Sequence, residues 1–474
     1  MERIYHIILG LLIGILPTLC VFGQPAGIAD NIDKYLSVRA EMGNFSGAIL
    51  VAKDNQIILR KGYGFADVEK RTPYTPETRQ EVASISKMFT AFAALQLRNE
   101  GKLRLSDSIC LYLQDCPEIW KPVTIENLIR HTSGIPDYEE ALELGSDKYF
   151  ELMTQPNTSA KIAENARKLP LDFKSGEKFK YSNTGYVILS FVVEKASQMP
   201  FEKYLKEKIF KPAGMKQTGV LGTKKPVKNL ANGYGPKKEL SWNQRLGGFA
   251  LTEGVLKKLP QLSLTPPHGD AGIYSTVDDL LRWSRAMDGG VITSAKDLSE
   301  IFSPQYGFGW FIDTDFERKR FRHNGILPGF LSEFIKFPEE KITIIIFSNL
   351  DHTRMSSVAR DVSAITLGKP FDMPVSGKVI TLTKEQIAAL EGIYETTDGN
   401  NLTIQNDPDL LSAYLKNPQG QLQFAAGLIP LSPTEFYFPF RDGKVIFLLG
   451  ENKKATKVNL RYRGADHIAE RVSK

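Results

Sequence analysis

Cysteine and histidine, the residues that most often hold metal ions, are scarce in this chain of 474 residues, with 3 cysteines and 6 histidines. So few cysteines exclude a small disulfide-rich scaffold. No group of cysteines and histidines has the spacing of a metal site. We therefore expect no metal ion and no other cofactor.

Strong charge of one sign is also missing. The chain has 60 lysines and arginines against 54 acidic residues, a net charge of +6. No basic run of the kind found in nucleic-acid-binding proteins occurs, so we expect no nucleic-acid partner. The mild excess leaves room for a weak attraction to cell-wall polymers, although a solvated surface explains it as well. The 42% hydrophobic and 24% charged content is typical of globular proteins.

A long apolar run occurs only near the N-terminus, at residues 7–21, after the positively charged Arg3. It is short for a membrane span and has the pattern of a secretory signal peptide, which we place at residues 1–23. Leu19 precedes Cys20, where a lipoprotein signal would have a small residue. We predict an exported protein, periplasmic or extracellular, with no stable membrane span after signal cleavage.

The most informative stretch is Ser84-Ile85-Ser86-Lys87, which opens an apolar run at 88–95 that predicts a buried helix. Residues three apart on a helix share a face, so Ser84 and Lys87 would lie side by side. A hydroxyl beside an amine is a nucleophile with a nearby base. The same spacing recurs at 175–178, but a glycine and polar neighbours indicate a turn there. The pattern alone is therefore weak evidence.

Two further motifs strengthen it. Tyr181-Ser182-Asn183 precedes a second helical run at 186–193, and His323-Asn324-Gly325 precedes a β-branched and aromatic run at 342–347 that predicts a strand. In this order the three motifs resemble the penicillin-recognising serine hydrolases, in particular the branch with class C β-lactamases, D-aminopeptidases, DD-peptidases and related esterases. The stretches 123–135, 173–183, 271–280 and 306–310 match further signatures, so the resemblance covers roughly residues 30–365.

The resemblance implies a role for each motif residue. Ser84 would attack an acyl carbon, desolvated Lys87 would help take its proton, and Tyr181 would pass a proton to the leaving group. An ammonium nearby would favour the phenolate of Tyr181. The oxyanion hole would come from the backbone N–H groups of Ser84 and Ile326. The predicted catalytic residues are Ser84, Lys87 and Tyr181, and the predicted substrate-binding residues are Asn183, His323, Asn324, Gly325 and Ile326.

The third motif departs from the Lys-Thr-Gly of class C β-lactamases, whose lysine helps to hold a substrate carboxylate. A histidine is mostly neutral at pH 7, so His323 would be a weaker anchor unless Arg322 compensates. His-x-Gly is the form found in D-aminopeptidases and many esterase relatives. We expect His131 to lie in the wall of the site without a chemical role, and His268 to lie in a loop.

The expected fold is α+β: a β-lactamase/transpeptidase-like antiparallel sheet flanked by helices, with a helical subdomain over roughly residues 100–290, followed by a small all-β barrel. Strands are predicted at 47–52, 56–62, 307–313, 319–324 and 342–348. A hydrolase domain at 24–368 would be joined through a linker at 369–377 to the barrel at 378–474, whose short, closely spaced strands resemble lipocalin-like domains. Cys110 and Cys116 would form a local disulfide or remain two free thiols.

Two classes of function follow. The first is an exported serine hydrolase that acts through an acyl-enzyme on a small amide, a D-amino-acid peptide or an ester, with β-lactamase or esterase activity as an alternative. The second is a penicillin-binding sensor that acylates without turnover. An intact Tyr181 favours turnover. The partner would be a small-molecule or peptide substrate, with cell-wall fragments included.

Overall fold

The computed structural model describes residues 27–142, 146–156, 158–222, 226–236, 256–262, 268–302, 305–374, 379–407, 410–438 and 442–472. The predicted signal peptide and part of the predicted linker lie outside these residues. Within the described part of the chain, no helix is long and apolar enough to cross a membrane.

A seven-stranded antiparallel sheet in the order β10-β11-β12-β13-β14-β1-β2 forms the centre of the larger part of the molecule. The predicted first hairpin is confirmed, because Asp54 and Asn55 both have positive φ angles, as a tight hairpin turn requires. The strands of this sheet are β1 (Gly47–Lys53), β2 (Gln56–Tyr63), β10 (Gln305–Tyr306), β11 (Phe311–Asp315), β12 (Arg318–Leu327), β13 (Phe330–Phe337) and β14 (Ile342–Ser348).

Helices cover both faces of the sheet. Phe334 and Ile345 belong to the hydrophobic cluster that includes α2 (Ser86–Asn99) and α10 (Val277–Asp288). Ile335 and Ile344 belong to the cluster on the other face, with α1 (Ile28–Glu41) and α12 (Met355–Thr366). Alternate residues of a strand point to opposite faces, which is why these strands are apolar throughout.

Two strand predictions need correction. Residues 307–310 are not a strand but a turn between β10 and β11, in which Gly309 has φ +80° and a Cβ there would lie 2.6 Å from the Cα of Met88. The turn therefore packs directly on the first residues of α2. Strand β13 was not predicted, because Ser332, Glu333 and Lys336 interrupt its apolar pattern although the whole strand is buried.

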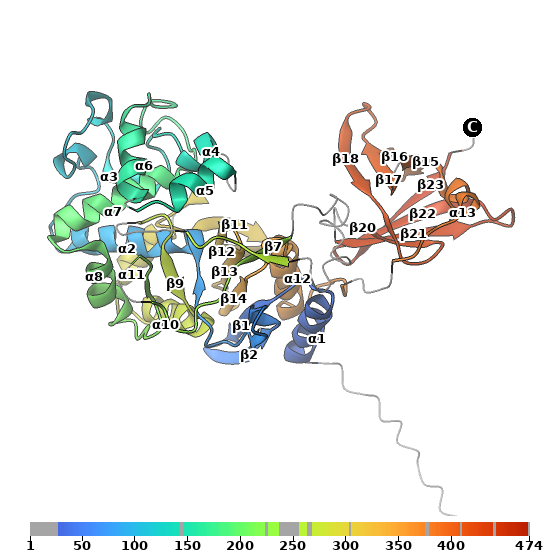
Figure 1. Ribbon diagram of the computed structural model, residues 1–474, viewed down its shortest axis with the longest axis horizontal. Coiled ribbons are helices and arrows are strands. Elements are labelled where there is room, and N and C mark those ends of the chain that lie inside the picture. The colour runs from blue at the N-terminus through green and yellow to red at the C-terminus, as the bar shows by residue number, and fades with distance from the viewer. Residues whose placement is uncertain are drawn as a thin grey trace, which may run out of the picture.

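The predicted helical region lies above one end of the sheet and packs around α7 (Asn183–Ser197) (Figure 1). Cys110 and Cys116 form a disulfide there. The other helices are α3 (Ile125–Ile129), α4 (Tyr138–Leu142), α5 (Asp147–Met153), α6 (Thr158–Arg167), α8 (Phe201–Tyr204) and α11 (Ala295–Ile301), and the short strands are β3 (Phe65–Asp67), β4 (Thr72–Pro73), β5 (Gln80–Glu81), β6 (Gly219–Val220), β7 (Tyr234–Pro236), β8 (Leu256–Lys258) and β9 (Ile273–Ser275).

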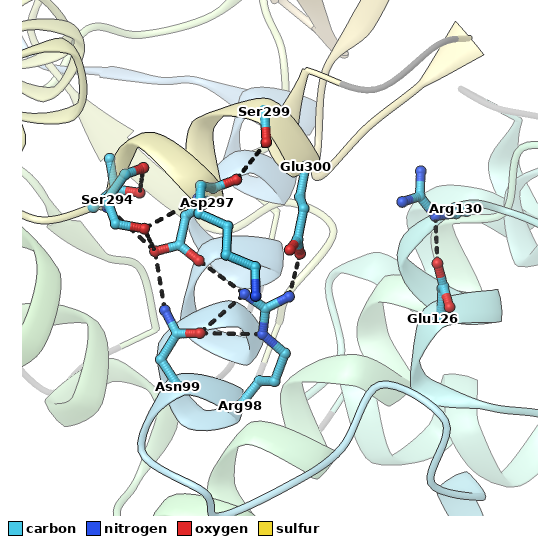
Figure 2. A network of polar contacts seen from close by, with 10 residues as sticks. Arg98, Asn99, Glu126, Arg130, Ser294, Asp297, Ser299 and Glu300 are labelled. Atoms are coloured by element: carbon cyan, nitrogen blue, oxygen red, sulfur yellow. Dashed lines mark hydrogen bonds and ion pairs between the residues drawn. The ribbon is translucent and has the colours of Figure 1, made fainter.

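The C-terminal end of α2 is fixed to α11 by a polar network (Figure 2). Arg98 forms ion pairs with Asp297, at 2.8 Å, and with Glu300. Asn99 donates to the second oxygen of Asp297 at 3.1 Å. This network helps to hold the helix whose other end carries Ser84 and Lys87.

The C-terminal residues form a second, nine-stranded antiparallel sheet shaped as a nearly closed barrel (Figure 1), in the order β18-β17-β16-β15-β23-β22-β21-β20-β19. The fold class is therefore confirmed. The elements of the C-terminal part are α13 (Lys384–Leu390), β15 (Gly392–Thr396), β16 (Asn401–Asp407), β17 (Leu410–Lys416), β18 (Leu422–Gly427), β19 (Ile429–Pro430), β20 (Glu435–Phe438), β21 (Gly443–Leu449), β22 (Ala455–Tyr462) and β23 (Ala465–Arg471).

A buried polar contact joins this second sheet to the first part of the chain. Arg39 of α1 forms an ion pair with Asp442, and the two side chains are only 3% and 5% exposed. Tyr437 donates to the other oxygen of Asp442 at 2.8 Å. Nearby, Tyr35 donates to Asp361 of α12 at 2.7 Å. The C-terminal sheet is thus docked on the α1 and α12 side.

Candidate active site

Ser84 lies in a 3₁₀ turn, Ala83–Ile85, directly before α2 rather than in the first α-helical turn. Ala83 has φ +50°, in the left-handed region that side chains other than glycine disfavour. The turn is held from two sides, since Val82 donates its N–H to Ile273 at 2.9 Å and its carbonyl accepts from Ser332 at 2.9 Å. Backbone strain of this kind is typical of functional sites.

Lys87 is fully buried, and its Nζ donates three hydrogen bonds. The acceptors are Ser84 Oγ at 3.0 Å, Asn183 Oδ1 at 2.7 Å and the backbone carbonyl of Asp270 at 2.9 Å. Burial lowers the pKa of Lys87, although the nearby carboxylates of Asp270, Glu139 and Asp137 act in the opposite direction. The amine therefore lies within hydrogen-bond distance of the Ser84 hydroxyl, and burial makes its ammonium a stronger acid than that of an exposed lysine.

The ring of Tyr181 lies 5.0 Å from Lys87 Nζ and is stacked on Phe311. Burial raises the pKa of Tyr181 well above its ordinary value, and the nearby Ser84 hydroxyl only partly opposes this. Desolvation is the largest influence on this pKa and disfavours the phenolate, whereas the expectation was that a neighbouring ammonium would favour it. Tyr181 rests as a phenol, a proton donor.

His131 supports Tyr181, as expected for a residue of the wall. Its ring lies 4.2 Å from the Tyr181 ring, and its Nδ1 accepts the backbone N–H of Ser182 at 3.0 Å. Burial lowers the pKa of His131 well below its ordinary value. The neutral imidazole fixes the loop that carries Tyr181.

Sequence reasoning missed a group of carboxylates behind Asn183. The amide nitrogen of Asn183 donates to Asp137 at 3.0 Å and to Glu139 at 2.9 Å, while its oxygen accepts from Lys87. Burial raises the pKa of Glu139 to about 8 and also raises that of Asp137. The sequence feature that could have indicated these two carboxylates is their position directly after the matched segment 123–135.

A third missed carboxylate, Asp270, lies on the other side of Lys87. Tyr138 donates to it at 2.9 Å, and His268 Nδ1 lies 2.6 Å from its Oδ1. Burial acts to raise the pKa of Asp270, but the neighbouring His268 and Lys87 outweigh it and lower this pKa. His268 is in a loop, as predicted, but it is fully buried against Asp270.

His323 is 1% exposed and packs between two polar partners. Its Nδ1 lies 2.7 Å from the Asn324 carbonyl, which can only accept, so Nδ1 carries the proton and Nε2 accepts from the Tyr306 hydroxyl at 3.0 Å. Burial lowers the pKa of His323 to about 3. Arg322 donates to Asp313 at 2.8 Å, so its charge is already paired. The motif therefore holds no free cation for a substrate carboxylate.

Gly325 lets β12 approach the Ser84 turn, because a Cβ there would lie 2.2 Å from the Val82 carbonyl oxygen. The pairing of β11 with β12 stops at Arg322, so among the described residues the edge of β12 beside Ile326 has no strand neighbour. Asn324 and Ile326 stand opposite Glu333 and Leu331. Their side chains thus point to the α12 face of the sheet.

The structure therefore brings five of the predicted residues together around one point and separates the side chains of Asn324 and Ile326 from them. Both side chains point to the other face of the sheet, so only the backbones of these two residues belong to this site. In the described part of the chain no group of three or more metal-binding side chains occurs. The residues that meet are Ser84, Lys87, Tyr181, Asn183 and His323.

Comparison with known proteins agrees with this geometry. The family model described as Beta-lactamase matches residues 32–367. Penicillin-binding protein 4* of Bacillus subtilis (strain 168) is 28% identical over 430 residues, covering 87% of this chain and 92% of its own length. Protein flp of Staphylococcus aureus (strain N315) is 30% identical over 337 residues, covering 68% of this chain and 63% of its own length.

Solved structures show the same fold. The octameric penicillin-binding protein homologue from Pyrococcus abyssi has a TM-score of 0.64 at 25% identity and covers 93% of this chain and 99% of its own. D-amino acid amidase from Ochrobactrum anthropi SV3 has a TM-score of 0.61 at 21% identity, covering 72% of this chain and 99% of its own. At that identity the second likeness shows the fold alone.

Proposed function

Because this chain belongs to the Beta-lactamase family, we propose that it is an exported serine hydrolase that forms an acyl-enzyme at Ser84. The substrate would be a small amide, a D-amino-acid peptide or an ester. The observation that carries the proposal is the 3.0 Å hydrogen bond between fully buried Lys87 and Ser84 Oγ. Desolvation of the amine makes it a better base at neutral pH than an exposed lysine.

The proposed reaction has two halves. Ser84 Oγ attacks the acyl carbon and loses its proton to the neutral amine of Lys87. The Tyr181 phenol protonates the leaving group as its bond to the acyl carbon breaks, and the Lys87 ammonium returns a proton to the phenolate. The N–H groups of Ser84 and Ile326 would bind the oxyanion. Water then attacks the ester, and the proton path runs in reverse to restore Ser84.

The charges of the site favour some substrates over others. Asp137 and Glu139 lie on the Asn183 side and Asp270 lies behind Lys87, while neutral His323 offers no positive charge. In their ionised forms these carboxyl groups attract an ammonium and repel a carboxylate, and a bound ammonium in turn favours ionisation of Glu139. Among the candidate substrates we therefore favour D-amino-acid amides and peptides with a free amino group over β-lactams and over peptides bound through a terminal carboxylate.

Two broader parts of the proposal rest on the sequence. Residues 1–23 would direct export to the periplasm or the medium, where cell-wall fragments are available as substrates. The hydrolase domain would comprise residues 24–368, and residues 378–474 would form a lipocalin-like barrel. The coverage of penicillin-binding protein 4*, which extends over 87% of this chain, supports a shared two-part organisation.

Mass spectrometry of intact residues 24–474 would test the proposal. The chain would be mixed with D-alaninamide, a D-Ala-D-Ala peptide, p-nitrophenyl acetate and a chromogenic cephalosporin, with Ser84→Ala as the control. We expect a transient acyl adduct and released product, largest for D-alaninamide. A persistent adduct would support the sensor reading instead. No adduct from any compound on the folded chain would refute Ser84 as the acyl acceptor.

A further inference from the structure

A second cavity lies on the other face of the central sheet. It has a volume of about 580 Å³ and lies between the N-terminal end of α12, the β12–β13 hairpin and the turns of the C-terminal sheet that carry Asp442 and Arg463. Glu333 lines it and stands opposite Asn324, on the same face as Leu331 of the α1 and α12 cluster. Phe334, the next residue, faces the α2 cluster. Glu333 therefore points away from Ser84, although the cavity also reaches Gly325, Ile326 and Ser332 at the edge of the candidate active site.

Glu333 is a buried acid without a partner. Its side chain is nine-tenths buried, and its Oε2 has no hydrogen-bond partner among the described residues. Burial raises the pKa of Glu333 to about 7, and the distant charges of Arg322 and Arg320 only partly oppose this. A carboxyl group buried without a partner is costly, which marks it as a group that a ligand would satisfy.

Two arginine side chains, whose positive charge is opposite to that of an ionised Glu333, line the same cavity. Arg354 precedes α12 and is half-buried, and Arg463 comes from the turn between β22 and β23. Over the described residues, neither guanidinium has an ion pair or hydrogen bond to another side chain. A planar guanidinium is the side chain that best matches a carboxylate.

The other acids of the lining are already engaged. Asp442 is paired with Arg39, and Asp372 accepts from Arg461 at 3.2 Å. Asp361 accepts from Tyr35 and from Arg360. Asp351, at the exposed rim, lies 3.8 Å from His352. Burial opposes ionisation of Asp442, and Arg354 helps Arg39 to lower the pKa of this group without an ion pair to it among the described residues. The groups left for a ligand are therefore the buried carboxyl group of Glu333 and the half-buried guanidinium of Arg354, with Arg463 at the rim.

We propose that this cavity binds a zwitterionic amino acid or dipeptide, with its ammonium at Glu333 and its carboxylate at Arg354 and Arg463. The site lies on the α12 side of the sheet, adjoins the acyl-transfer site at β12, and would exist even if Ser84 were not acylated. Because Arg463 and Asp442 belong to the C-terminal sheet, that sheet completes the pocket. Its role would thus be to bind small peptides or amino acids beside the catalytic unit.

Isothermal titration calorimetry of the Ser84→Ala chain, residues 24–474, would test this with D-alanine and D-alanyl-D-alanine. Their N-acetyl and C-terminal amide forms, each lacking one charge, are the matched ligands. We expect Glu333→Gln and Arg354→Gln each to weaken zwitterion binding about ten- to a hundredfold, as expected for loss of a charged hydrogen bond. The N-acetyl and amide forms should bind as weakly to the parent chain.

Two control variants separate this site from others. Arg285→Gln removes a guanidinium from α10 on the opposite face of the sheet, and we expect it to leave binding unchanged. Glu139→Gln alters the candidate active site, and it should also leave binding at the second cavity unchanged. Binding that Glu139→Gln abolishes and Glu333→Gln does not would place the ligand at the catalytic site and overturn the proposal. So would equal binding of all analogues, or no binding of D-alanine and D-alanyl-D-alanine to the parent chain at millimolar concentration. Loss of binding in a variant supports the proposal only where the melting temperature of that variant is unchanged.

Discussion

Replacing Asp442 with asparagine should loosen the C-terminal sheet from the rest of the molecule. Asp442 and Arg39 are 5% and 3% exposed, so the variant leaves the Arg39 guanidinium buried without its counter-charge. Breaking one side of a buried ion pair typically costs about 3–5 kcal/mol. The contact is between two sheets with separate hydrophobic cores. The substitution should therefore destabilise the contact between the C-terminal sheet and the rest of the molecule, and leave the two hydrophobic cores intact.

Hydrogen exchange read by mass spectrometry measures this directly. In Asp442→Asn we expect faster exchange in α1 and in β20, where Tyr437 contacts Asp442, with the core strands β13 and β14 unchanged. The double variant Arg39→Met, Asp442→Leu removes both charges, and we expect it to recover most of the protection. Unchanged exchange in Asp442→Asn, or a double variant that exchanges as fast as the single one, would show that this ion pair does not hold the C-terminal sheet in place.

The pH dependence has a definite sign. Burial opposes ionisation of Asp442, but Arg39 outweighs it and lowers the pKa of Asp442 below its ordinary value. A lowered pKa in the folded state means that the stabilisation is present above the unfolded value of about 3.9 and is lost as the pH falls through the folded value. Docking in the parent chain should therefore weaken only below about pH 4, and Asp442→Asn should lack this transition.

Three further predictions concern the candidate active site. Tyr181→Phe should lower kcat by about 10²–10⁴-fold, the usual contribution of a general acid, while rapid-quench mass spectrometry still detects slow acylation of Ser84; unchanged turnover would exclude Tyr181 as the proton donor. Glu139→Gln should raise KM for D-alaninamide about tenfold or more but leave p-nitrophenyl acetate hydrolysis nearly unchanged, and equal losses would show a structural role. Because the pKa of Glu139 is raised to about 8, KM expressed for the ammonium form of the amide, whose own amino group titrates at about pH 8, should fall as the pH rises toward 8 in the parent chain and not in the variant. His323→Lys should increase acylation by a penicillin relative to D-alaninamide, and an unchanged ratio would contradict the charge argument.

The site residues that lie in recognisable motifs could be predicted from the sequence. Ser84 and Lys87 are three residues apart, so their 3.0 Å hydrogen bond is a local property. Asn183 meets Lys87 at 2.7 Å across 96 positions, and the family resemblance, not local spacing, predicted that it belongs to the site. The first hairpin was predictable from local sequence, since Asp54 and Asn55 are turn residues.

The contacts that depend on long-range packing could not be predicted from the sequence. Glu139 and Asp270 are far apart in the chain, and only the packing of the helical region on the sheet places both beside Lys87. Strand β13 has polar residues that its pattern cannot explain. Each finds its own environment: Ser332 bonds the Ser84 turn, and Lys336 bonds Ser284 at 2.8 Å and Asp288 at 2.6 Å.

The carboxylates and the neutral histidine have one common consequence for Lys87. A site that held a lysine in place of His323 would put a second cation beside Lys87, which would lower its pKa further and attract carboxylate substrates. Here the neighbouring charges are negative, so they stabilise the Lys87 ammonium against desolvation. A substrate ammonium near Glu139 would offset those negative charges and favour loss of the Lys87 proton. In this arrangement an amine-bearing substrate helps to prepare the base that activates Ser84, and removing the amino group from the substrate should lower kcat as well as raise KM.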